Sequence, residues 1–224
     1  METSISTIRR GALAILVATG LSACAAQPPI ENAAVTRTAP PEAGIDAVAA
    51  APVAPRFSVE EINVKVPRNL RVSERNSYYP GGDIVWREDP IGDRHKQVAD
   101  IVYAGLKKGA DRLEGDRAVI LDVVVRRFHA LSEKARYTIG GVHAIQFDLT
   151  VLDAGTGEVL VPEQRIKADF DALGGMAAIA AEQRGVTQKV RITDHLAKVI
   201  EEELSTEDGY SEQATGFFGA INQI

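Results

Sequence analysis

Two of the four histidines, His129 and His143, fall in segments that we expect to be neighbouring strands. A register that sets Leu121 against Val151 aligns the apolar sides of both strands, because side chains alternate between the faces of a sheet. The same register places His129 opposite His143. Two imidazoles can hold a metal ion when a carboxylate completes the set, but no pattern fixes a third ligand. A polar sheet edge is therefore the favoured interpretation, and a metal-dependent hydrolase using this pair is an alternative.

Basic side chains surround the connection between the same two strands, namely Arg126, Arg127, Lys134 and Arg136. Such a cluster could contact anionic lipid or lipopolysaccharide headgroups. The alternative is a solvated loop without a ligand, and it is the interpretation we favour.

Two aromatic features could form a partner surface. Trp86 is the only tryptophan, and an exposed tryptophan would suggest an interface, although a single tryptophan in a domain is more often a core residue. Near the end of the chain, Phe217 and Phe218 could share a helical face with other apolar residues. That segment either docks onto another protein or packs on its own domain, and the sequence leaves both open.

The single cysteine, Cys24, follows a charged start and an apolar stretch of about ten residues, the layout of a secretory signal peptide. The tetrad that ends in Ala23 and Cys24 resembles a bacterial lipobox. The resemblance implies cleavage between these two residues and covalent lipid, including palmitate, on Cys24. It also implies attachment to the cell envelope, with the periplasmic face of the outer membrane favoured over the inner membrane because no Asp follows the cysteine. No other cofactor is expected.

Composition narrows the class of function. The 224 residues contain 25 Lys and Arg against 31 Asp and Glu, a formal net charge of −6. This balance argues against a nucleic-acid partner, since such domains are usually basic. One cysteine excludes a disulfide framework. The chain has no phosphate-binding loop, no Gly-x-Ser-x-Gly turn and no His-Glu-x-x-His pair, so we expect a protein that is not an enzyme.

The distribution of residue types divides the chain into four parts. All 12 aromatic residues follow Arg56, whereas 6 of the 10 prolines precede it. We therefore expect a signal peptide at 1–23, a lipidated cysteine with an Ala/Pro-rich, disordered tether at 24–56, a folded domain at 57–206 and a tail at 207–224.

Periodicity within the domain predicts an α+β fold, a mainly antiparallel sheet with two helices packed on one face. One helix is capped by Asp93 and the other by Thr187; their expected buried stripes are Val98, Ile101, Val102 and Leu106, and Val190, Ala197, Ile200 and Leu204. A strand is expected over 59–66 and a short one near 83–87. Three longer strands follow, and the last two are joined by a turn at 153–157.

Four segments of the domain resemble a family of small alphaproteobacterial lipoproteins of unknown function; they are 82–86, 127–130, 137–143 and 188–192. The order of elements is also distantly similar to auxiliary lipoproteins of envelope transport systems. The resemblance assigns no catalytic residue. It implies a lipid-anchored protein with a structural, assembly or transport-accessory role, which binds the membrane through its lipid and an envelope protein through its domain. A carrier of a lipid or small amphiphile, held between sheet and helices, is the alternative.

Overall fold

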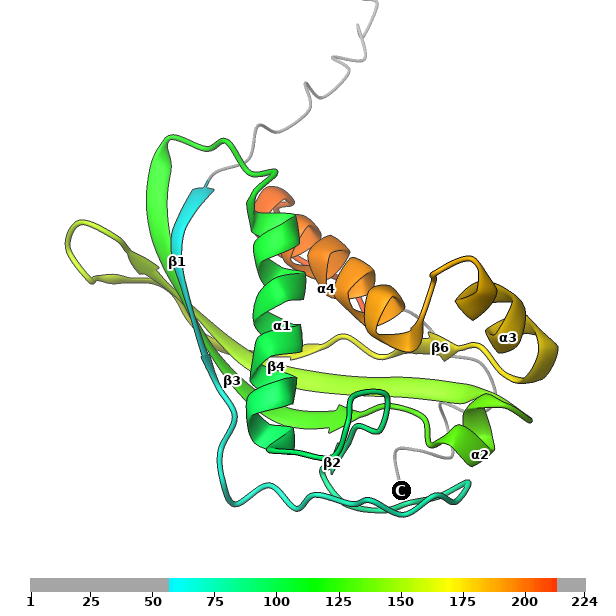
Figure 1. Cartoon of the computed structure of the whole chain (residues 1–224). Helices are drawn as coiled ribbons and strands as arrows, with labels where there is room; N and C mark the ends of the chain where they lie inside the picture. Colours follow the sequence, from blue (N-terminus) through cyan, green and yellow to red (C-terminus); the bar gives the residue numbers. More distant parts are fainter. Residues whose placement is uncertain (1–56, 213–224) are drawn as a thin grey trace, which may run out of the picture. The chain divides into compact units, whose positions relative to one another are not determined.

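A computed structural model describes residues 57–212, which form an α+β domain (Figure 1). The elements in chain order are β1 (Phe57–Lys65), β2 (Ile84–Val85), α1 (Arg94–Ala110), β3 (Arg117–His129), α2 (Glu133–Arg136), β4 (Gly141–Asp153), β5 (Val159–Lys167), β6 (Phe170–Ala172), α3 (Gly175–Gln183) and α4 (Gln188–Ser205). The expected signal peptide, Cys24, the tether and the tail residues Phe217 and Phe218 lie outside the described residues.

The expected α+β fold with a mainly antiparallel sheet is confirmed, but the sheet is mixed, because two of its strands pair in parallel. Its main path runs β1-β3-β4-β5, and β2 and β6 add short pairings at the ends of β3 and β4. Both β1 and β2 run parallel to β3, whereas β3, β4, β5 and β6 pair antiparallel. The reason is the helix α1, which carries the chain back along the sheet after β1 so that β3 starts at the same end.

The register between β3 and β4 is as expected over most of its length and shifts near the end. Leu121 pairs with Val151, and Val125 with Phe147. A bulge between Val125 and Arg127 then moves the pairing by one residue, so that His129 lies opposite Ala144. The predicted direct pairing of His129 with His143 is therefore wrong.

Both long helices begin where the sequence predicted. The side chain of Asp93 accepts from the backbone N–H of Lys96 at the start of α1, and that of Thr187 accepts from Val190 at the start of α4. These bonds satisfy N–H groups that have no partner inside the helix. Every predicted stripe residue is buried except Val190, which is exposed because it lies in the first turn of α4.

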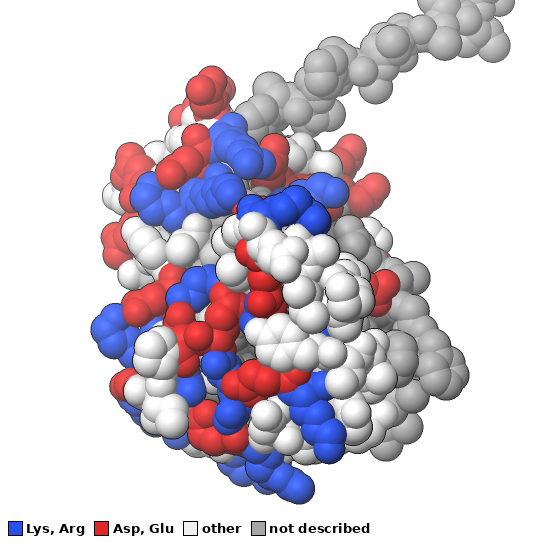
Figure 2. Space-filling model, turned by 45° about the vertical axis from the view of Figure 1, so that its right-hand side comes forward, with Lys and Arg blue, Asp and Glu red and all other residues white. Residues whose placement is uncertain are grey.

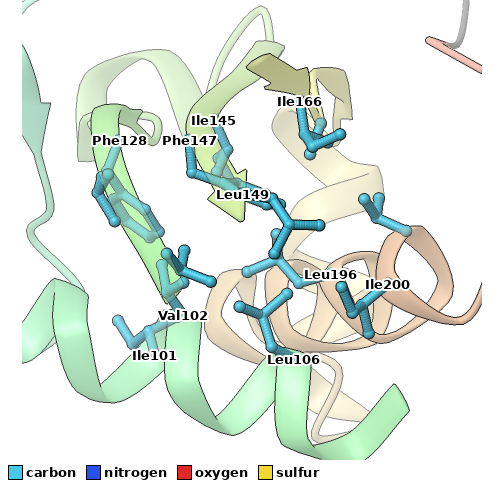
Figure 3. Close-up of a cluster of buried hydrophobic side chains, with 14 of the residues drawn as sticks. Ile101, Val102, Leu106, Phe128, Ile145, Phe147, Leu149, Ile166, Leu196 and Ile200 are labelled. Atoms are coloured by element: carbon cyan, nitrogen blue, oxygen red, sulfur yellow. The ribbon is translucent and has the colours of Figure 1, made fainter. Parts of the chain in front are cut away.

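The core lies between the helix pair and one face of the sheet (Figure 3). Leu106 of α1 and Leu196 and Ile200 of α4 are fully buried with Phe147 and Leu149 of β4. Trp86 is also fully buried and its ring meets Phe128 edge-on, with centroids 5.9 Å apart.

Glycines let α1 approach α4 closely. A Cβ on Gly109 would lie 2.1 Å from the carbonyl oxygen of Ala197 and 2.6 Å from a methyl of Ile200. A Cβ on Gly105 would lie 2.8 Å from that of Leu196. Glycine normally weakens a helix. Two glycines one turn apart in α1 therefore indicate that these positions must lack a side chain for the two helix backbones to pack closely.

No helix within residues 57–212 is long and apolar enough to cross a membrane.

We predict that Gly109→Ala destabilises the domain by about 3 kcal/mol, because its Cβ would overlap a backbone carbonyl that cannot rotate away. An alanine in an ordinary exposed helix position would stabilise by about 1 kcal/mol instead. Urea unfolding measures the difference. Gly155→Ala is the matched control, since its Cβ would meet only the Asp153 side chain at 3.5 Å. Equal stability of Gly109→Ala and wild type would show that the helices do not pack as described.

Candidate functional site

A hollow with an apolar rim lies where β3 ends and β4 begins. Its cavity volume is about 30 Å³, and it is lined by Tyr78, Tyr79, Pro80, His129, Ala130, Leu131, Ser132, Ala135, Ile139, Gly140, Gly141 and Val142. Tyr79 is 63% exposed and Ile139 is 51% exposed. Exposed aromatic and aliphatic side chains around a concavity are typical of a binding surface.

Two parts of the chain that are far apart in sequence, 78–80 and 129–142, bring these side chains together. We call the segment 77–80, which carries Tyr78 and Tyr79, the tyrosine loop. Ser132 caps α2 and donates its hydroxyl to the carbonyl of Ser77 at 2.7 Å, which holds the tyrosine loop close to the end of β3. Gly140 has a φ of 76°, and a Cβ there would lie 3.0 Å from the carbonyl oxygen of Ala172. This left-handed turn lets the chain enter β4 beside Ile139.

His129 forms part of the hollow's wall and does not behave as a free ligand. It is buried at 6% exposure. Burial, together with the charge of Arg127, lowers the pKa of its imidazole to about 4, and a hydrogen bond with the backbone of Gly81 opposes this shift. A neutral His129 thus ties the tyrosine loop to the end of β3.

His143 belongs to a separate cluster on the helix side of β4. Its ring lies 4.8 Å from that of Phe170, which stacks on His195 of α4 at 4.1 Å. Burial lowers the pKa of His143 well below its ordinary value, and burial also lowers that of His195 to about 4. Both imidazoles are therefore neutral at pH 7 and pack as aromatic rings between β4, β6 and α4.

The two histidines do not form a metal site in the described structure. Within residues 57–212, no group of three or more His, Cys, Asp or Glu side chains is placed to share one metal ion. The third ligand that the hydrolase alternative requires is thus missing from this part of the chain.

The four basic residues that the sequence grouped together are dispersed. Arg136 is buried and pairs with Glu88 at 3.0 Å and Glu182 at 2.6 Å. Lys134 lies over the ring of Tyr78, with its Nζ 4.7 Å from the centroid. The hypothesis that Arg136 is an exposed headgroup contact is therefore wrong. Its side chain points inward from α2 and pairs with one carboxylate in the loop before α1 and with another in α3.

Arg126 and Arg127 also lie in different surroundings. Arg127 is half-buried opposite Gln146, whereas Arg126 is exposed on the face of the sheet away from α1 and α4. There Arg126 and Arg165 of β5 each donate through Nε to the buried carboxylate of Asp148. Burial alone would raise the pKa of Asp148, but the two arginines lower it, so the carboxylate is ionised at neutral pH.

Ion pairs also join the loop before α1 to the rest of the domain. The indole N–H of Trp86 donates to Asp89 at 2.8 Å, and Lys189 of α4 pairs with the same carboxylate at 2.5 Å. Glu88 accepts from the backbone N–H of Lys189 at the start of α4. The interpretation of Trp86 as a core residue is confirmed, and the hypothesis that it is an exposed contact is wrong.

Figure 2 shows acidic and basic side chains interleaved on one face of the domain, beside an area without charged side chains.

The profile of a family of unknown function (DUF6778) matches residues 57–220, and the match begins at the first residue of β1. The chain belongs to this family. The comparison with curated proteins gives no match. The family description assigns no catalytic residue or ligand, so function has to be argued from the site.

Three solved structures are similar to the chain. A candidate lipoprotein from Caulobacter crescentus is 22% identical with a TM-score of 0.32, over 48% of this chain and 80% of that one. A DUF330 protein from Xanthomonas campestris is 13% identical with a TM-score of 0.39, over 69% and 83%. An uncharacterized protein is 17% identical with a TM-score of 0.34, over 67% and 94%. At these scores the likeness carries no inference about function.

Sequence reasoning missed the tyrosine rim and the contribution of Arg165. The adjacent pair Tyr78-Tyr79 before a Pro-Gly-Gly turn was a visible signal for exposed aromatic residues in a loop. Arg165 could not be linked to Arg126 without the register between β4 and β5, which is interrupted by irregularities.

Acidification should destabilise the domain already below about pH 6.5, at pH values higher than those at which carboxylates take up protons. The pKa of His195 is about 4 in the folded state, whereas an unfolded histidine titrates near 6.5. The unfolded chain therefore binds the proton first, and stability that is fully present above pH 6.5 is lost as the pH falls towards 4. The loss is about 1.4 kcal/mol per pH unit for each such histidine.

Urea unfolding at pH 7 and pH 5 measures this effect, with His195→Gln as the variant. The variant should lose part of the pH dependence in this window. Between pH 8 and pH 7 its dependence should equal that of wild type. An unchanged dependence between pH 7 and pH 5 in the variant would contradict the assignment.

Proposed function

We propose that the chain is a lipid-anchored protein of the bacterial cell envelope whose domain binds a partner protein and does not catalyse a reaction. The observation that carries the binding role is the hollow rimmed by Tyr78, Tyr79 and Ile139. The lipid anchor rests on the lipobox-like tetrad that ends at Cys24. A structural, assembly or transport-accessory role agrees with both features.

The position of the hollow supports a partner that is not the membrane. The chain reaches the domain at β1, whose Phe57 pairs with Arg117 at the start of β3 (Figure 1). The hollow is lined by His129, the residue at the other end of β3. A strand of 13 residues spans about 40 Å. A domain held by lipid on Cys24 therefore carries the tyrosine rim at the end of β3 that is far from the entry of the tether, and the outer membrane remains the favoured location.

The chemistry of the rim supports an apolar contact. Arg136, near the hollow, is paired with Glu88 and Glu182, and Lys134 lies over the ring of Tyr78. The exposed side chains of Tyr79 and Ile139 add aromatic and aliphatic contact area, and burial of such area contributes about 25 cal/mol per Å² before the costs of association. An exposed apolar segment of an envelope protein is the partner that suits this surface.

Photo-crosslinking in living cells tests this proposal. A photoreactive amino acid at Tyr79 should give one discrete adduct with an envelope protein, and the same amino acid at Tyr103 should not. Tyr103 is the matched control because it is 43% exposed but lies on α1. The Cys24→Ala chain should lose most of the adduct, since the tether no longer concentrates the domain near its partner.

The other outcomes separate the alternatives. Equal adduct patterns at Tyr79 and Tyr103 would contradict a specific protein contact at the hollow. A mass increase the size of a lipid at Tyr79, without a protein adduct, would favour the carrier.

A further inference from the structure

The face of the sheet opposite α1 and α4 carries a row of basic side chains across neighbouring strands. Lys65 pairs in register with Val124, Val124 with Asp148 and Asp148 with Arg165. These four residues therefore lie side by side across β1, β3, β4 and β5, at strand spacings of about 4.8 Å. Arg126, at the bulge in β3, is on the same face and reaches Asp148.

Asp148 holds the two guanidinium groups in place. Its carboxylate is 5% exposed, while the side chains of Arg126 and Arg165 are 41% and 48% exposed. Each arginine uses Nε for the carboxylate, so the terminal amino groups bond no acceptor among residues 57–212. Planar guanidinium groups with free amino edges suit the oxygens of a phosphate group.

The charge of this row is positive although the chain is acidic. Two arginines share one carboxylate, and Lys65 is exposed with no ion-pair partner among the described residues. Two acids flank the row: Asp122, one row away, accepts a hydrogen bond from Asn63 at 3.1 Å, and the exposed Glu163 lies two residues before Arg165 on β5. Lys167 lies beyond Arg165 on β5 and pairs with Glu212 at 3.7 Å.

We propose that Arg126, Arg165 and Lys65 bind the phosphate groups of anionic phospholipids in the membrane that carries the lipid anchor. This inference rests on the proposed anchor, because a tethered domain meets that membrane at a high effective concentration. The row thus orients the domain on the membrane and leaves the tyrosine rim free for a protein partner. Each basic side chain near an anionic surface contributes about fivefold in binding.

Vesicle flotation of the whole mature chain carrying Cys24→Ala tests the row without the anchor. The chain should float with vesicles of phosphatidylcholine and phosphatidylglycerol and not with phosphatidylcholine alone, and added salt should release it. Lys65→Gln should weaken binding about fivefold. The triple change Arg126→Gln, Asp148→Asn and Arg165→Gln should weaken it further; it removes the whole ion-pair group and leaves no lone buried charge.

Arg112→Gln is the control, because it also lowers the net charge by one but pairs with Glu201 between α1 and α4. Its binding should equal that of the parent chain. Equal weakening by Lys65→Gln, the triple change and Arg112→Gln would show that only the overall charge matters, and this would overturn the proposal. A parent chain that does not float with the anionic vesicles would also overturn it, while the proposed lipidation of Cys24 would be unaffected. Release by inorganic phosphate at constant ionic strength would make the row a site for free phosphate and would also overturn it.

Discussion

The close approach of α1 to α4 at Gly105 and Gly109 is the constraint on which the rest of the domain depends. Because these residues have no side chain, the two helices lie against each other and together cover one face of the sheet. The apolar side chains of β3 and β4 are buried there, and polar and basic side chains are left on the other face. A wider spacing would expose the core residues Leu106 and Leu196 and separate the start of α4 from Glu88 in the loop before α1.

Most of the groups that could have carried chemistry stabilise this packing instead. His143 and His195 are neutral rings on either side of Phe170, and Arg136 joins two carboxylates. Such groups are costly to leave unpaired once buried, which explains their ion pairs and ring contacts. What the domain offers to other molecules is surface, namely an apolar rim at one end and a basic row on the open face.

The sequence predicted much of the fold because its signals are local. Asp93 and Thr187 cap the helices as expected, and alternation fixed the pairing of Leu121 with Val151. The parallel β1 and the bulge at Arg127 were missed, since strand order and a one-residue shift depend on packing far along the chain. For the same reason His129 and His143, adjacent in the expected register, belong to different clusters, while Tyr79 and Arg165 went unnoticed.

We propose that the two binding surfaces of the domain act in the envelope because lipid on Cys24 holds the domain there. Mass spectrometry of the N-terminal peptide from the membrane-purified protein tests this claim most directly. We expect a chain that begins at Cys24 and carries a diacylglycerol thioether with a further acyl chain. A free thiol at Cys24, or a chain that retains Met1 or begins at another residue, would contradict it.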